Sequence, residues 1–240
     1  MKGSIAAVSA AATLLFAGAA NAGSTLGINY FEIAEPTSNG DFGPCCSSPP
    51  ATGEGVLAGT SLLGGLPVVG PGSTVQSVSG SGQILWWSDG VDGIMKTGSG
   101  SVSLPYASNM FAPNSTGSGD GGDFETAALW GDLHGTGADV KITVSSDDDT
   151  LVYVNGMFVG GNLGVHGTET TTIDLGDLSG LASLKVFYAD RAQTGANLAL
   201  SVSGATTSVP ELSTWGMMGL GFVGLGLVGY RARKTVRLAV

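Results

Sequence analysis

Three adjacent carboxylates are the feature of this sequence with the clearest chemical potential. Asp147, Asp148 and Asp149 stand between the run ADVKITV and the run LVYV, which an Asn-Gly turn follows. Carboxylates this close together raise one another's pKa unless a cation compensates. The pattern therefore leaves three interpretations: a solvated turn, a pair of groups that exchanges a proton, or a site for Ca²⁺, which binds about six to eight oxygen ligands.

The composition favours strands as the elements that position these carboxylates. Gly contributes 41 of the 240 residues, and each glycine inside a helix costs about 1 kcal/mol relative to alanine. Short apolar runs, several of them alternating, are separated by turn residues, which is typical of an antiparallel β-sandwich. We therefore expect an all-β fold, with strands over 83–87, 138–144, 151–154, 157–159, 184–188 and 198–202.

Both ends of the chain carry targeting features. Residues 1–22 have a basic start, an apolar core and a final Ala-Asn-Ala, which predicts a secretory signal peptide cleaved between Ala22 and Gly23. Residues 215–230 form an uncharged apolar stretch, and the basic tail 231–240 follows it. This pattern predicts a transmembrane helix whose tail stays in the cytoplasm, so the body of the protein is exported.

The charge distribution excludes a nucleic acid as a partner. All 19 acidic residues but only four of the nine basic residues lie in 23–211, so this part carries 4 − 19 = −15. Such a surface repels polyanions and attracts divalent cations. Cys45 and Cys46 are the only cysteines and are adjacent. A labile disulfide, an intermolecular disulfide and free thiols all remain open for them.

The C-terminal segment resembles a known sorting signal. Val209, Pro210 and Glu211 precede Ser-Thr-Trp, the apolar helix and the sequence RARK, in the order of a PEP-CTERM signal, with Leu212 in place of that signal's second proline. The resemblance implies a Gram-negative host, processing by an exosortase, and delivery to the cell envelope or extracellular matrix. Residues 205–214 would then be an exposed linker. A plain single-span membrane anchor is the alternative interpretation.

A second resemblance covers residues 84–204. The segments SSDDDTLVYVNGMFVGG and KVFYADRAQTG, with MFAPN and FETA upstream, resemble a fibro-slime domain. That family is related to the protective-antigen-type β-sandwich of flocculins and other adhesins. The Gly/Ser/Pro-rich segment 23–83 lies outside this resemblance, and we expect it to pack on the sandwich or extend it.

The second resemblance also implies a metal site. In the sugar-binding adhesins an Asp-Asp pair joined by a cis peptide holds Ca²⁺, and this pair corresponds to Asp147 and Asp148. A second loop contributes an asparagine and backbone carbonyls, and Asp190 stands in the asparagine position. Asp149 is expected outside the pair as a solvated neighbour. Arg191 is expected to neutralise an acid in a structural salt bridge, and contact with a ligand is the alternative role for it.

The same resemblance to the fibro-slime domain indicates the remaining candidate positions. His166 is expected either to line the same end of the sandwich or to fix a loop. Ala192 and Thr194 lie in the second loop and are further candidates for loop or ligand positions.

Together these features predict an exported, non-catalytic, calcium-dependent adhesion module that binds exopolysaccharide or another glycan. The first alternative is a structural matrix or envelope protein in which Ca²⁺ serves only stability. The second is a carbohydrate-active hydrolase with paired carboxylates. His134 and His166 are the only imidazole bases available to such an enzyme, and neither lies in a recognisable nucleophile motif.

Overall fold

The structure is a computed structural model that describes residues 24–34, 38–43, 58–110, 123–192 and 194–209. Within these residues it contains strands and no helix, and every pairing between strands is antiparallel. The all-β prediction is therefore confirmed. The strands are β1 (Thr25–Ala34), β2 (Ile94–Ser103), β3 (Tyr106–Asn109), β4 (Asp123–Asp147), β5 (Asp149–Val154), β6 (Met157–Asn162), β7 (Glu169–Ala189), β8 (Asn197–Ser203) and β9 (Ala205–Ser208).

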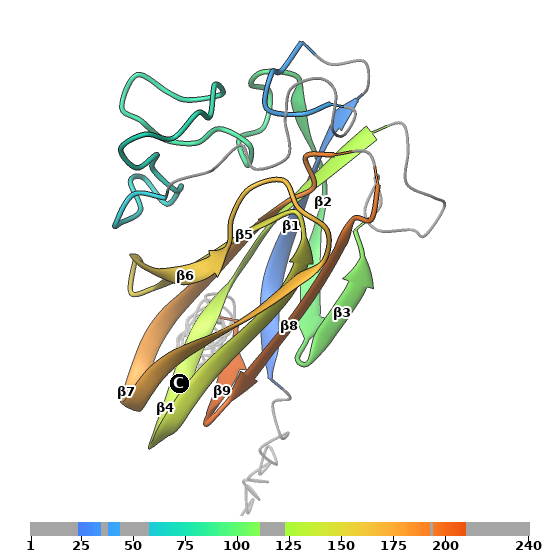
Figure 1. Ribbon diagram of the computed structural model, residues 1–240. Helices are drawn as coiled ribbons and strands as arrows, with labels where there is room; N and C mark the ends of the chain where they lie inside the picture. The colour runs from blue at the N-terminus through green and yellow to red at the C-terminus, as the bar shows by residue number, and fades with distance from the viewer. Residues whose placement is uncertain (1–23, 35–37, 44–57, 111–122, 193, 210–240) are drawn as a thin grey trace, which may run out of the picture.

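Two long strands, β4 and β7, link the layers of a sandwich (Figure 1). The first half of β4 pairs with the second half of β7 in a layer ordered β2-β1-β4-β7-β5-β6. The second half of β4 pairs with the first half of β7 and with β8, which in turn pairs with β3. The register between β4 and β7 shifts between Thr136 and Asp139, where Gly137 has a φ of 83°. Glycine adopts this left-handed conformation without steric cost, so the long β4–β7 pair can bend there.

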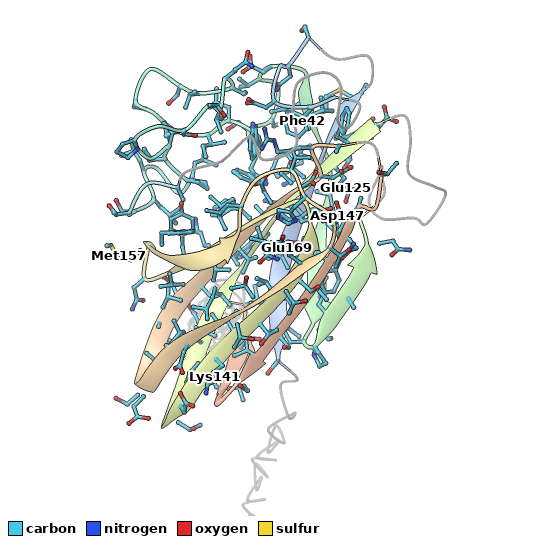
Figure 2. The ribbon with its side chains drawn as sticks, in the orientation of Figure 1. Phe42, Glu125, Lys141, Asp147, Met157 and Glu169 are labelled. Atoms are coloured by element: carbon cyan, nitrogen blue, oxygen red, sulfur yellow. The ribbon has the colours of Figure 1, made fainter. Side chains whose placement is uncertain are left out.

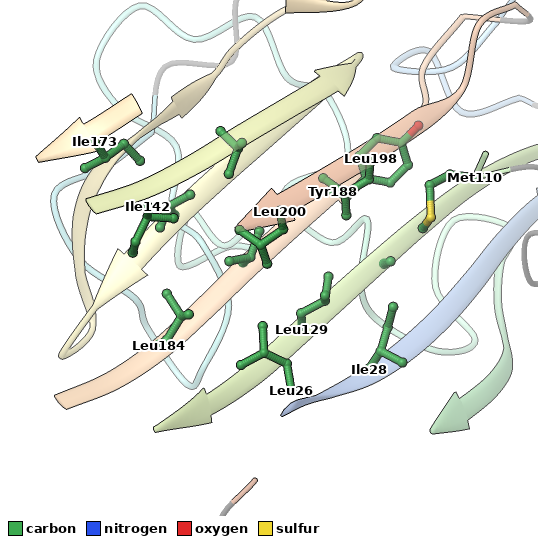
Figure 3. Close-up of a cluster of buried hydrophobic side chains, with 14 of the residues drawn as sticks. Leu26, Ile28, Met110, Leu129, Ile142, Ile173, Leu184, Tyr188, Leu198 and Leu200 are labelled. Atoms are coloured by element: carbon green, nitrogen blue, oxygen red, sulfur yellow. The ribbon is translucent and has the colours of Figure 1, made fainter. Parts of the chain in front are cut away.

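The main hydrophobic core lies between the two layers (Figure 3). Leu26, Ile28 and Leu129 come from the first layer, whereas Ile142 and Leu200 come from the second. Each of these side chains is at most 1% exposed. Because successive residues of a strand point to opposite faces, the alternating pattern of these strands directs one set of side chains into this core.

A second core covers the outer face of the first layer. Phe31, Phe124 and Phe187 project from β1, β4 and β7, and they pack with Trp86 and Trp87 from the segment between β1 and β2. Burying aromatic side chains removes a large apolar area from water. The central strands of the first layer are therefore covered on both faces, and residues 58–93 form the outer cover, whereas the edge strand β2 is largely exposed (Figure 1).

Two local expectations were wrong. Residues 83–87 do not form a strand, because both tryptophans turn into the same core: Trp86 Nε1 donates to Asp41 Oδ2 (2.9 Å) and Trp87 Nε1 donates to the Tyr188 carbonyl (2.8 Å). The expected linker 205–214 also starts too early. Its first residues form β9, which pairs with residues 132–135 of β4, and Thr207 is buried there.

The predicted terminal features lie largely outside the described residues. This holds for the signal peptide with its Ala22–Gly23 cleavage site, for Cys45 and Cys46, and for the apolar stretch and basic tail after residue 209. Val209 is described and is half-buried, whereas Pro210 and Glu211 are not described. No helix long and apolar enough to cross a membrane occurs in the described part of the chain.

Candidate functional site

Four aspartates gather at one end of the sandwich, where β4 and β7 end and β5 begins. Asp147, Asp148, Asp149 and Asp190 are 7%, 1%, 0% and 1% exposed, respectively. Figure 2 shows Asp147 at this end, beside Glu125, with Lys141 toward the opposite end of the sandwich, near the bend of β4. The peptide bond between Asp147 and Asp148 is cis. The interpretation as a solvated turn is wrong, and so is the expected exposure of Asp149, because β4 and β5 continue almost without interruption across the acidic run.

Asp148 ties three segments together through its carboxylate. Its Oδ1 accepts the backbone N–H of His166 (2.9 Å), and its Oδ2 accepts those of Arg191 (2.8 Å) and Ala192 (3.0 Å). Burial raises the pKa of Asp148, and these three amides and the nearby His166 charge oppose that rise. The carboxylate therefore positions the loop after β6 and the loop after β7 against the start of β5.

Asp149 forms a buried ion pair with Arg191. The Arg191 guanidinium lies 3.3 Å from Asp149 Oδ2, and both side chains are at most 1% exposed. Arg191 Nε also donates to the Asp41 carbonyl (3.0 Å), and its guanidinium lies 5.0 Å from the centre of the Trp86 ring. The Gly164 amide donates to the Asp149 carboxylate. Burial nevertheless raises the pKa of Asp149 to about 6, although the Arg191 charge lowers it.

Asp147 lies against the loop that joins β7 to β8. Its carbonyl accepts a hydrogen bond from the Tyr188 hydroxyl (2.5 Å). Gly195 has a φ of 92°, and a Cβ atom at this position would lie 2.6 Å from Asp147 Oδ2. Glycine is therefore the residue that lets this loop approach the carboxylate. Thr194, the neighbouring candidate, is exposed at the rim.

Asp190 is the first residue after β7, and its backbone N–H donates to the Glu125 carbonyl (3.0 Å). The pKa of Tyr188 is raised well above 10, first by burial and then by the charges of Asp190, Asp148, Asp147 and Glu125. The predicted trio Asp147, Asp148 and Asp190 is therefore buried at one end of the sandwich, although 42 residues separate Asp148 from Asp190 in the chain.

A buried polar network behind the aspartates was missed in the sequence. Ser146 donates to the Asp148 carbonyl (2.8 Å) and is hydrogen-bonded to Thr150, while Asn162 Nδ2 donates to Ser146 Oγ (3.0 Å) and to the Glu169 carbonyl (2.8 Å). Strand alternation offered a signal for Ser146, which follows the buried Val144 by two positions. No sequence signal pointed to Asp41, which lies about 100 positions before the acidic run.

His166 belongs to the same end through its backbone and is half-buried. Its Nδ1 is hydrogen-bonded to the Gly167 carbonyl (2.8 Å). Its Nε2 is buried and has no hydrogen-bond partner among the described residues. His166 is expected either to line this end of the sandwich or to fix a loop. The two roles do not exclude each other, because its backbone lies at this end and its ring bonds within the loop.

The donor types at this end suit calcium better than zinc, because carboxylate oxygens are hard ligands. As they stand, however, no three Asp, Glu, His or Cys side chains among the described residues are arranged so that they could hold a metal ion. Asp148 already accepts three amide hydrogen bonds, which leaves about one of its four lone-pair positions. The chemistry of the residues thus fits Ca²⁺, whereas binding would require their carboxylates to turn toward a common point.

Comparisons with known proteins identify no family for this chain: no known family profile and no curated protein matches it. Among solved structures, it is similar to the PA14 sugar-binding domain from an RTX adhesin, with 25% identity over 36% of this chain and 50% of that one, at a TM-score of 0.29. The alignment thus spans half the length of that domain.

Two further solved structures align over most of their length. One is the PA14 domain of the MpAFP antifreeze protein, with 14% identity over 77% of this chain and 90% of that chain, at a TM-score of 0.34. The other is the A domain of epithelial adhesin 9 from Candida glabrata in complex with Galβ1-4GlcNAc, with 9% identity over 79% and 91%, at a TM-score of 0.35. At these scores the likenesses establish neither a family nor a ligand for this chain.

Proposed function

We propose that this protein is an exported, non-catalytic, calcium-dependent carbohydrate-binding module of a bacterial cell surface or its exopolysaccharide matrix. The observation that carries this proposal is the excess of buried negative charge at one end of the sandwich. Glu125, Asp147, Asp148, Asp149 and Asp190 are all buried, whereas Arg191 is the one buried cation in the described part of the chain.

Buried carboxylates in excess of buried cations are costly unless a proton or a metal ion neutralises them. Asp149 is paired with Arg191. We assign Asp147, Asp148 and Asp190, which are buried at the same end of the sandwich, as the residues that would hold Ca²⁺. A bound Ca²⁺ would neutralise this charge and could offer a coordination position to sugar hydroxyls. The protein's own contribution is to hold the loops around residues 164–166 and 190–196 against the acidic run.

The rim of this end offers groups that could contact a glycan. Thr168 and Glu169 are exposed, and Asn197 Nδ2 donates to Thr168 Oγ1 (2.8 Å) across the two loops. Thr194 is exposed beside them. Hydroxyl and amide groups at a rim can exchange hydrogen bonds with sugar hydroxyls, and such sparse polar groups fix the orientation of a ligand.

Calorimetric titration of the purified full-length chain with Ca²⁺ tests the metal site. We expect binding at millimolar Ca²⁺ in the native chain and its loss when Asp147→Asn and Asp190→Asn are combined. Asp174→Asn is the matched control, because Asp174 is an exposed acid whose ion-pair partner, Lys141, lies toward the opposite end of the sandwich. Equal binding by the native chain and the double variant would remove Ca²⁺ from this site.

A glycan array with and without EDTA tests the carbohydrate partner. Binding that appears only with Ca²⁺ and disappears in the double variant supports the module, and release of reducing sugar from a bound glycan would contradict a non-catalytic role. Ca²⁺ binding without any glycan supports the second candidate, a structural matrix protein. That candidate is favoured by one observation: Asp148 and Asp149 already brace the loops through amide hydrogen bonds and the Arg191 ion pair.

Export and sorting form a separate part of the proposal, and they rest on the signal peptide and the PEP-CTERM resemblance. We expect a membrane-bound precursor that an exosortase processes near Pro210 and Glu211. Immunoblots of membrane and extracellular fractions, with and without the exosortase, measure this processing. An unchanged distribution would favour the plain membrane anchor.

A further inference from the structure

We propose a second, calcium-independent ligand site: a pocket for one acidic sugar residue on the outer face of the first layer. A cavity of about 260 Å³ lies there, where the covering segment meets β1, β4 and β7. Its lining includes four aromatic side chains, one amide and one ammonium group. These are Phe31, Trp87, Trp130, Phe187, Asn29 and Lys185.

Strand register explains why the sheet is hollow at this point. Asn29, Ala128 and Phe187 lie opposite one another in β1, β4 and β7, so their side chains share one face. The small Ala128 stands between two larger side chains, and the next row on the same face contains Trp130 and Lys185 as partners. The larger neighbours therefore form the walls of a hollow whose floor is the alanine.

Gly27 sets the position of one wall. It is the partner of Trp130 across β1 and β4, and a Cβ atom at this position would overlap with the Trp130 indole. The glycine thus allows the indole to lie against β1. Trp130 is half-buried, whereas Phe31, Trp87 and Phe187 are at most 4% exposed. The indole is the large apolar surface of the pocket that a ligand can still cover.

Lys185 supplies a positive charge beside this indole. Its Nζ donates one hydrogen bond, to the Gly65 carbonyl (3.2 Å), and an ammonium group has three donors. Within the described residues Lys185 forms no ion pair with a carboxylate. In a chain whose segment 23–211 carries −15, a half-buried lysine without an acidic partner is placed to bind an anionic group.

These groups together match a uronic acid. The apolar face of a pyranose ring can lie on the Trp130 indole, its carboxylate can pair with Lys185, and its hydroxyls can exchange hydrogen bonds with Asn29. The volume suits a single sugar unit, because cavities for drug-sized ligands measure roughly 300–1,000 Å³. The choice of a sugar extends the proposed function, but the pocket shares no residue with the acidic end. Lys185 lies five residues before Asp190, which is about 16 Å along an extended chain.

Titration of the purified full-length chain with glucuronate and galacturonate in EDTA tests this site. We expect a Kd of the order of 1 mM, which is typical of a ligand with so few atoms, and a change in tryptophan fluorescence on binding. Lys185→Met keeps most of the apolar stem and removes the charge, so it should weaken binding at least tenfold. Trp130→Ala should abolish the saturable signal. Lys141→Met removes an exposed ammonium group that does not line the pocket, so it should change nothing.

The outcomes separate this site from the calcium site. Saturable uronate binding in EDTA that Lys185→Met weakens supports the pocket, whether or not Ca²⁺ binds elsewhere. Undetectable binding, or binding that Lys185→Met and Trp130→Ala leave unchanged, overturns it. Glucose should bind at least tenfold more weakly than glucuronate. Benzoate that binds as well as glucuronate would show a site for aromatic acids and would overturn the assignment to a sugar.

Discussion

The buried ion pair between Arg191 and Asp149 leads to a prediction about stability. Replacing Arg191 by methionine keeps an unbranched apolar side chain over Trp86 but removes the charge, so Asp149 stays buried without its cation. At a separation of 3.3 Å and an effective dielectric constant of about 20, the attraction between the two charges is about 5 kcal/mol. Removing one partner of such a pair costs about 3–5 kcal/mol in comparable proteins, and we expect Arg191→Met to lower the free energy of unfolding by that amount.

The double variant Arg191→Met with Asp149→Asn isolates the electrostatic part of this loss. The asparagine side-chain oxygen can still accept the Gly164 amide, and the carboxylate that Arg191 paired with is no longer present. We therefore expect the double variant to be more stable than the sum of the two single losses implies, by about 2–3 kcal/mol.

Urea denaturation in EDTA at neutral pH, followed by tryptophan fluorescence, measures these free energies, and equal m-values would show that the variants unfold from comparable states. Lys141→Met is the matched control. It breaks the pair between Lys141 and Asp139 (2.7 Å), whose side chains are 40% and 56% exposed, and pairs this exposed add little to stability. This prediction is refuted if the stability losses of the two single variants simply add up in the double variant. It is also refuted if Arg191→Met lowers the free energy of unfolding by less than about 1 kcal/mol.

Three further changes test other parts of the fold. Tyr188→Phe removes the donor to the buried Asp147 carbonyl and should cost about 1–3 kcal/mol in the same assay; an unchanged midpoint would contradict that hydrogen bond. Leu151→Ala opens a cavity in the outer core and should cost about 2–5 kcal/mol, whereas Leu181→Ala at a 64% exposed position should cost no more than about 0.5 kcal/mol. Gly195→Ala places a methyl group against the Asp147 carboxylate at a φ of 92°, so it should lower the free energy of unfolding by about 1–3 kcal/mol. It should also reduce any rise in Tm caused by Ca²⁺. Native-like values for both quantities would show that the loop is free to move.

The positions of most strands could be predicted from the sequence because they depend on local alternation. Residues 138–144, 151–154, 184–188 and 198–202 alternate or carry apolar runs, and all of them lie within β4, β5, β7 and β8. The segment 83–87 shows the limit of this signal. Ile84, Trp86 and Trp87 are buried, but the two tryptophans pack into the same core, and that arrangement depends on Asp41 and on the Tyr188 carbonyl.

The candidate site divides in the same way. Local sequence singled out the acidic run and Asp190, and the resemblance to the adhesins placed the pair at Asp147 and Asp148, where the structure has its cis peptide. The burial of Asp149 could not be predicted, because a triple aspartate taken alone favours solvent. It becomes buried only because Arg191, Trp86 and Asp41 converge on it from distant parts of the chain.

By itself, the sequence determined the fold class, the excess negative charge and the places where acidic residues stand, since these depend on composition and on patterns of a few residues. The tertiary structure alone decided which residues meet. Pairing of β1, β4 and β7 brings Asn29, Trp130 and Lys185 to one face, and the ends of β4 and β7 bring Asp148 to the amides of Arg191 and Ala192. Such contacts depend on strand register and on the packing of the covering segment, which are collective properties of the whole domain that no local stretch of residues specifies.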